Sequence, residues 1–229
     1  MSDVSTESAV KAILARAEER FQQSRQELFG STDKLLAYLM MGQWVFAIGM
    51  AVFVSPWAWA GKTQTLHPHV WAAVLLGAVL GSMPIALAWL RPGWVVTRHV
   101  IAGSQMLWSA LLIHLSGGRI ETHFHVFGSL GILATYRDWP VLLTATIVVA
   151  LEHFIRGIVW PESVYGIPNP EWWRFLEHAF WVVFAVSYLG LMSKRGKQEM
   201  RTAAERGAEM EALAEGEWRK ASVVTRAAS

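Results

Sequence analysis

Six runs of apolar residues, each nearly free of formal charge, constrain the fold of this 229-residue chain more than any other feature. A helix needs roughly 20 apolar residues to cross a bilayer, and four of the runs have about that length. The other two reach it only if neighbouring polar residues are included. We therefore predict an all-α integral membrane protein with a six-transmembrane-helix bundle. The runs cover residues 35–54, 70–90, 100–115, 126–136, 141–160 and 175–192.

The composition agrees with this assignment. Hydrophobic residues make up 53% of the chain and charged residues 17%, whereas soluble domains carry about 25% charged residues. There is no cysteine, which excludes disulfides, thiolate metal ligands and cysteine nucleophiles. The chain also lacks a P-loop, a dinucleotide-binding glycine pattern and a kinase signature, and we expect no nucleic-acid partner.

The distribution of basic residues predicts the topology, because Lys and Arg concentrate in cytoplasmic loops. Segments 91–99 and 137–139 and the tail from Lys194 hold most of the loop Lys and Arg, whereas segments 55–69 and 116–122 hold few. We therefore expect a multi-pass protein of the bacterial inner membrane, surrounded by lipid, with both termini in the cytoplasm.

The two ends of the chain differ from the apolar middle. Residues 1–30 have apolar side chains at helical spacing and predict an amphipathic cytoplasmic helix, which a break at Gly30–Asp33 would separate from a membrane domain over 31–193. Residues 194–229 form a polar tail, predicted to be a cytoplasmic signalling helix. Its thin apolar seam favours a coiled-coil-like homodimer, with a solvated single helix as the alternative. The seam residues are Met200, Ala203, Gly207, Met210 and Ala214.

Imidazole and carboxylate side chains gather at one predicted depth, near the outer ends of four different membrane helices. Ionisable groups inside a membrane are costly and usually mark function. Glu152 and Arg156 lie four residues apart, so we expect an internal ion pair, with both residues as secondary candidates for the site. His67 and His69 fall in a predicted outer loop and are expected to be solvated. The candidate metal ligands are His114, Glu121, His123, His125, His153 and His178.

Histidine with carboxylate suits transition metals, and the absence of thiolate disfavours a structural zinc site. Five histidines with Glu121 exceed the needs of one tetrahedral ion, so a dinuclear iron site is favoured, with copper or zinc as alternatives. A b-type haem held by two histidines is the rival cofactor.

The stretch His114-x-Ser-Gly-Gly-x-Ile-Glu-x-His-Phe-His-x-Phe127, followed by Tyr136-Arg-Asp-Trp139, resembles a known sequence pattern. It is similar to the N-terminal multi-helix membrane sensor region of bacterial histidine kinases, chemoreceptors and diguanylate cyclases. The resemblance covers roughly residues 35–195. It implies a sensory unit whose histidines bind a cofactor or ligand, and a cytoplasmic signalling output domain or partner.

Three functions remain open from the sequence. The first is a metal-containing membrane sensor, in which redox state or a small ligand shifts the helices and the tail carries the signal. The second is a membrane metalloenzyme of the di-iron oxidase or hydroxylase type. The third is a transporter, which the absence of an inverted repeat disfavours. We favour the sensor over the enzyme.

Overall fold

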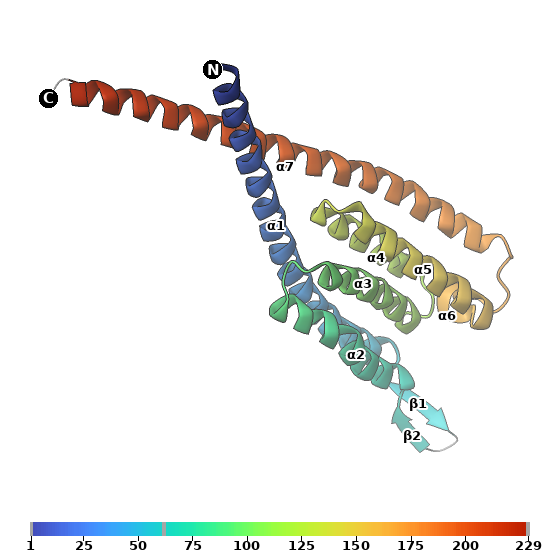
Figure 1. Cartoon of the computed structure of the whole chain (residues 1–229). Coiled ribbons are helices and arrows are strands. Elements are labelled where there is room, and N and C mark those ends of the chain that lie inside the picture. Colours follow the sequence, from blue (N-terminus) through green and yellow to red (C-terminus); the bar gives the residue numbers. More distant parts are fainter. Residues whose placement is uncertain (1, 61–62, 228–229) are drawn as a thin grey trace. The chain divides into compact units, whose positions relative to one another are not determined.

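The computed structural model describes residues 2–60 and 63–227, and nearly all of them are helical (Figure 1). This confirms the all-helical prediction, apart from a small hairpin. The helices are α1 (Ser2–Val54), α2 (Pro68–Leu90), α3 (Val95–Leu115), α4 (Ile120–Leu133), α5 (Trp139–Val159), α6 (Glu162–Tyr165) and α7 (Arg174–Ala227), with one 3₁₀ turn at Ala134–Tyr136. Strands β1 (Trp57–Ala60) and β2 (Thr63–Leu66) pair antiparallel, with Trp57 opposite Leu66.

Four helices of the described chain are long and apolar enough to cross a membrane: Ala9–Val54, Pro68–Leu90, Trp139–Val159 and Arg174–Gly216. Helices α3 and α4 do not meet the same criteria. Helix α4 has 14 residues, which is about 21 Å at the α-helical rise and shorter than the hydrocarbon core. Helix α3 carries polar groups such as Arg98 and Gln105. Several apolar helices are therefore present, and the six-span bundle stays a prediction.

The chain divides into two compact units. The larger unit covers residues 28–194, and the smaller one combines residues 1–27 with residues 195–229. Helices α1 and α7 therefore each contribute to both units.

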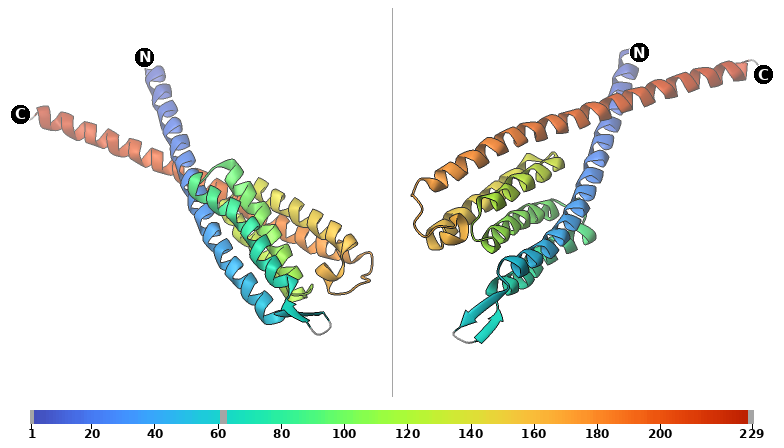
Figure 2. Two further views of the ribbon diagram at one scale, coloured as in Figure 1. Left: turned by 90° about the horizontal axis from the view of Figure 1, so that it is seen from below. Right: turned by 180° about the vertical axis from the view of Figure 1, so that it is seen from behind.

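Helix α3 lies at the centre of the larger unit. It packs against α2, α4 and α5, and α2 to α5 run side by side in every view (Figures 1 and 2). Most α3 side chains between Ile101 and Leu115 are buried. By contrast, α2 and α5 expose large apolar side chains on one face, such as Val79 and Leu151. This distribution suits a bundle in lipid, where outward apolar surface has no cost and the central helix is enclosed on all sides.

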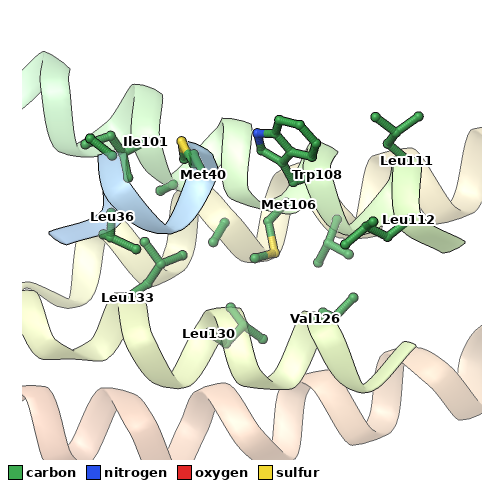
Figure 3. Close-up of a cluster of buried hydrophobic side chains, with 14 of the residues drawn as sticks. Leu36, Met40, Ile101, Met106, Trp108, Leu111, Leu112, Val126, Leu130 and Leu133 are labelled. Atoms are coloured by element: carbon green, nitrogen blue, oxygen red, sulfur yellow. The ribbon is translucent and has the colours of Figure 1, made fainter. Parts of the chain in front are cut away.

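The core of this unit joins α1 to α5, and most of its large side chains come from α1, α3 and α4 (Figure 3). Helix α1 provides Leu36 and Met40, α3 provides Trp108, and α4 provides Leu130 and Leu133. All five side chains are fully buried. The first part of α7 packs on this core through partly buried apolar residues, Val182, Val186 and Leu189.

A buried polar network, here called the Asp33 cluster, links α1 to two interhelical turns of the larger unit. Asp33 accepts hydrogen bonds of 2.6 Å from the Tyr136 hydroxyl and from the Gly93 backbone N–H. Arg98 donates from Nε to Asp138 Oδ2 at 2.8 Å, and its guanidinium also lies within 3.4 Å of the Gly93 carbonyl. Tyr136 and Asp138 belong to the Tyr-Arg-Asp-Trp motif, so that motif joins distant segments as well as forming a turn.

The expected helix break at Gly30–Asp33 is wrong, because α1 continues from Ser2 to Val54. A glycine inside a helix costs only about 1 kcal/mol relative to alanine. Ser31 Oγ donates to the Leu28 carbonyl inside the helix. Asp33, the last residue of the expected break, lies inside the helix and is bonded to Tyr136 and Gly93.

The smaller unit pairs the first part of α1 with the last part of α7. Its buried apolar residues are Ala17, Phe21, Ala204 and Ala208. Ala204 and Ala208 lie one position away from the predicted seam residues Ala203 and Gly207, so a neighbouring stripe of α7 packs within the chain. Exposed ion pairs between α1 and α7 flank these buried residues, and each contributes about 0–1 kcal/mol to stability. They are Arg16–Glu215 at 3.0 Å, Arg20–Glu211 at 2.9 Å and Arg201–Glu18 at 3.2 Å.

Candidate functional site

The histidines predicted to form one site are divided among three neighbourhoods of the larger unit. His123 on α4, His153 on α5 and His178 on α7 come together. The His123 ring centroid lies 5.6 Å from that of His153 and 5.3 Å from that of His178, in edge-to-face arrangements. His125 and His114 each lie with other partners.

His125 belongs to a hydrogen-bond network between α1, α3 and α4. Its Nε2 lies 2.9 Å from the Gln43 amide nitrogen, which is a donor, so Nε2 accepts. Its Nδ1 then carries the hydrogen and lies 2.8 Å from Ser109 Oγ. Ser109 Oγ in turn donates to the Gln105 carbonyl at 3.2 Å. Both ring nitrogens of His125 are thus used in joining helices.

The neighbours of His114 lie outside the set of predicted metal ligands. His114 Nδ1 is 2.8 Å from Ser163 Oγ on α6, and its ring contacts Trp160 and His69 with centroid distances of 4.8 and 4.9 Å. His69 is the second residue of α2 rather than a solvated loop residue. The position of the Leu-His-Pro-His segment directly before an apolar run was the available signal.

The remaining candidates are Glu121, Glu152 and Arg156. Glu121 is exposed in the first turn of α4. The expected Glu152–Arg156 ion pair is present, with Oε1 and Nε 2.6 Å apart. Glu152 Oε2 also lies 2.6 Å from His153 Nδ1, although neither contact has hydrogen-bond geometry. Arg156 donates from Nη1 to the Ala110 carbonyl at 2.9 Å and so joins α5 to α3.

The predicted metal centre is wrong. Among the described residues, no group of three or more His, Cys, Asp or Glu side chains could hold a metal ion. The reason is geometric: His114 and His125 are committed to other helices, Glu121 is exposed, and Glu152 is paired with Arg156. No similarity to a cofactor-binding family supports a haem either. The iron, copper, zinc and haem assignments are therefore withdrawn, together with the di-iron enzyme.

A groove of about 840 Å³ opens beside the three clustered histidines and is here called the histidine groove. Its walls come from α4, α5 and the first part of α7, and most of their side chains are apolar. Its polar lining residues are His123, Thr146, His153, Arg174, Glu177 and His178. Its aromatic lining residues are Phe124, Phe127, Phe175, Trp181 and Phe184. A volume of this size suits a small lipophilic molecule.

The imidazoles of the histidine groove have defined hydrogen-bond roles. His123 Nδ1 lies 3.0 Å from the Arg119 carbonyl, and His178 Nδ1 lies 3.0 Å from the Arg174 carbonyl. A carbonyl accepts only, so each Nδ1 of the neutral ring carries the hydrogen and each Nε2 is an acceptor. His123 is 5% exposed, and its Nε2 is buried with no hydrogen-bond partner among the described residues. An unsatisfied buried polar atom of this kind needs an explanation.

Short loops and turns hold this end of the larger unit together. Gly118, with φ of +74°, approaches Gly166 so closely that a Cβ on Gly118 would lie 2.2 Å from the Gly166 nitrogen. Tyr165 stacks edge-on against His178, and burial raises the pKa of its phenol. Arg174 donates to Glu171 at 2.6 Å, and this hydrogen bond lowers the pKa of the Glu171 carboxyl. The second glycine of the Gly-Gly in the sequence motif thus has a steric role.

A segment of 130 residues is 31% identical to the Transducer protein Htr8 of Halobacterium salinarum. The match covers 55% of this chain and 20% of the transducer, so the chain spans about a fifth of that relative's length. No family model and no solved structure matches the chain. The similarity to a transducer fits the resemblance to membrane sensor regions loosely, and it suggests a role in signal transduction.

Proposed function

We propose that residues 28–194 form the membrane-embedded input module of a signal transducer, and that α7 carries its output. One observation carries the proposal. A single helix, α7, lines the histidine groove near its start, at His178 and Trp181, and forms part of the smaller polar unit near its end. An event in the groove would therefore act directly on the helix that leaves the membrane.

The stimulus in this proposal is a small lipophilic ligand in the histidine groove. A ligand shifts an equilibrium between two helix arrangements only by binding one of them better. The walls of the groove come from three separate helices. A change in the spacing of these helices changes the contacts available to the ligand, so the two arrangements would bind it with different affinity. The similarity to a transducer supports the signal-transduction role.

The proposal places the chain as a multi-pass protein in the bacterial inner membrane, with both termini cytoplasmic. Helices α3 and α4 are assigned as the third and fourth membrane segments, shielded from lipid on several sides by their neighbours. The support is the predicted segregation of basic residues and the four helices that are apolar enough to span.

The proposed output is pairing of α7 with α7 of a second copy. The support lies on the α7 face that the chain does not itself cover. Met210 and Leu213 are 66% and 64% exposed, and Ala203 is also exposed. Ala204 and Ala208 are buried inside the smaller unit. The exposed stripe is short and poor in large residues, which suits a weak and reversible contact.

Cysteine crosslinking in native membranes tests this function, and the cysteine-free chain gives a clean background. A single cysteine at Ala203 is expected to crosslink between copies, whereas one at the buried neighbour Ala204 is not. Filling the groove with Ala179→Phe should change the Ala203 crosslinking rate severalfold. The matched control is Leu191→Phe, which adds the same ring to an exposed α7 position outside the groove lining.

Two results would contradict the proposal. Crosslinking at Ala204 in place of Ala203 would mean that the buried stripe pairs between copies. The second is an unchanged rate of crosslinking through the cysteine at position 203 in a correctly inserted Ala179→Phe protein. It would mean that the groove does not influence the pairing of α7.

A further inference from the structure

We propose that the histidine groove binds a membrane quinol through one of its phenolic hydroxyl groups. This inference rests on the proposed function, since it names the ligand class of the same site. It starts from the buried Nε2 of His123, which has no hydrogen-bond partner in the described part of the chain and lies across the ring from the Nδ1 that the Arg119 carbonyl holds.

The histidines select for a hydrogen-bond donor. His123 and His178 both present Nε2 as an acceptor, because a backbone carbonyl holds the hydrogen on Nδ1. A ligand hydroxyl donating to His123 Nε2 would satisfy its missing bond. A ligand with only carbonyl oxygens would instead bring lone pairs against lone pairs.

The one lining side chain that carries a permanent positive charge does not reverse this preference. Arg174 lines the groove, but its Nε and Nη2 both donate to Glu171, at 3.1 and 2.6 Å. Two of its nitrogens are therefore held by a carboxylate of the loop before α7. Arg156, the other nearby cation, is not part of the lining and is held by Glu152 and the Ala110 carbonyl.

The walls favour an aromatic headgroup on a long apolar chain. Five aromatic side chains line the groove, and aromatic rings pack well edge-on or offset against one another. Most of the remaining lining is aliphatic, including Val126, Val149 and Val182, and the Thr146 hydroxyl donates to a carbonyl of its own helix. A quinol combines the three features that are complementary to the groove: a hydroxyl donor, an aromatic ring and a lipophilic tail.

Calorimetric titration of the full chain in nanodiscs, with empty nanodiscs as the partition control, tests this inference. The first probe pair is an alkylphenol and its methyl ether, which differ in the hydroxyl donor and are stable in air. The second pair is a short-chain benzoquinol, kept reduced, and the matching benzoquinone. The hydroxyl-bearing member of each pair is expected to bind about tenfold more tightly, because tenfold corresponds to the contribution of one good hydrogen bond.

His123→Leu should abolish this discrimination, so that quinol and quinone bind equally and the quinol loses about tenfold in affinity. The control is His99→Leu, because His99 bonds to Thr144 and does not line the groove. Equal binding of phenol and ether to the unaltered protein would overturn the inference, and so would discrimination that survives His123→Leu. Either result would leave the crosslinking test of the signalling function unaffected, because that test uses no ligand.

Discussion

The Asp33 cluster and the histidine groove both contain ionisable side chains at helix junctions of one unit. They differ in whether the buried polar atoms of these side chains have hydrogen-bond partners. In the Asp33 cluster both carboxylate oxygens of Asp33 are bonded, and Arg98 is paired with Asp138. In the groove, His123 Nε2 is buried without a partner among the described residues. Satisfied buried groups hold a fold together, whereas an unsatisfied one beside a cavity marks a place for a ligand.

The largest effect on stability is expected at Asp33. Asp33→Ala removes the acceptor of two short hydrogen bonds and leaves Tyr136 and the Gly93 N–H buried without it. We expect the free energy of unfolding to fall by about 4 kcal/mol, because two buried donors each lose their acceptor at a cost of about 2 kcal/mol. Detergent-induced unfolding followed by tryptophan fluorescence measures it. Glu171→Ala, at an exposed carboxylate, should cost less than about 1 kcal/mol, and a similar loss for both variants would break the comparison.

The next effect concerns the turn that frames the groove. Gly118→Ala combines left-handed backbone strain with a Cβ 2.2 Å from the Gly166 nitrogen, which cannot rotate away. We expect a loss of about 3 kcal/mol. The matched variant is Gly117→Ala, with the same kind of backbone, φ +73°, but open space around its Cβ, and about 1 kcal/mol is expected there. The same unfolding assay applies, and equal losses would show that the two turns do not need to approach.

The smallest effect separates two histidines of one helix. His125→Leu removes a ring bonded to Gln43 and Ser109 and should cost about 2 kcal/mol. His123→Leu removes one bond, from Nδ1 to the Arg119 carbonyl, together with a buried Nε2 that has no partner among the described residues, so we expect a loss below about 1 kcal/mol. Thermal unfolding in one detergent compares them. If His123→Leu were the more destabilising of the two, His123 would be structural and the contrast between the regions would fail.

Local sequence signals were sufficient for the helices and for some pairs. Charge-poor runs of helical length predicted the all-helical fold, because backbone groups in an apolar medium must bond within their own segment. The spacing of Glu152 and Arg156 predicted their ion pair, which the structure contains at 2.6 Å, because residues four apart on a helix are neighbours. Both inferences need only the geometry of a single helix.

The partners of each histidine and of Asp33 depended on the tertiary structure. Helix α4 begins at Ile120, so His123 and His125, two positions apart, point to different sides, one to the groove and one to Gln43 and Ser109. The predicted single metal site required them to converge, and no signal within α4 specifies which helix covers each side. Asp33 likewise fell in a predicted helix break, but its carboxylate bonds to Tyr136, 103 positions away in the sequence. Contacts between distant segments are set by how whole helix faces pack, which the spacing of individual residues does not encode.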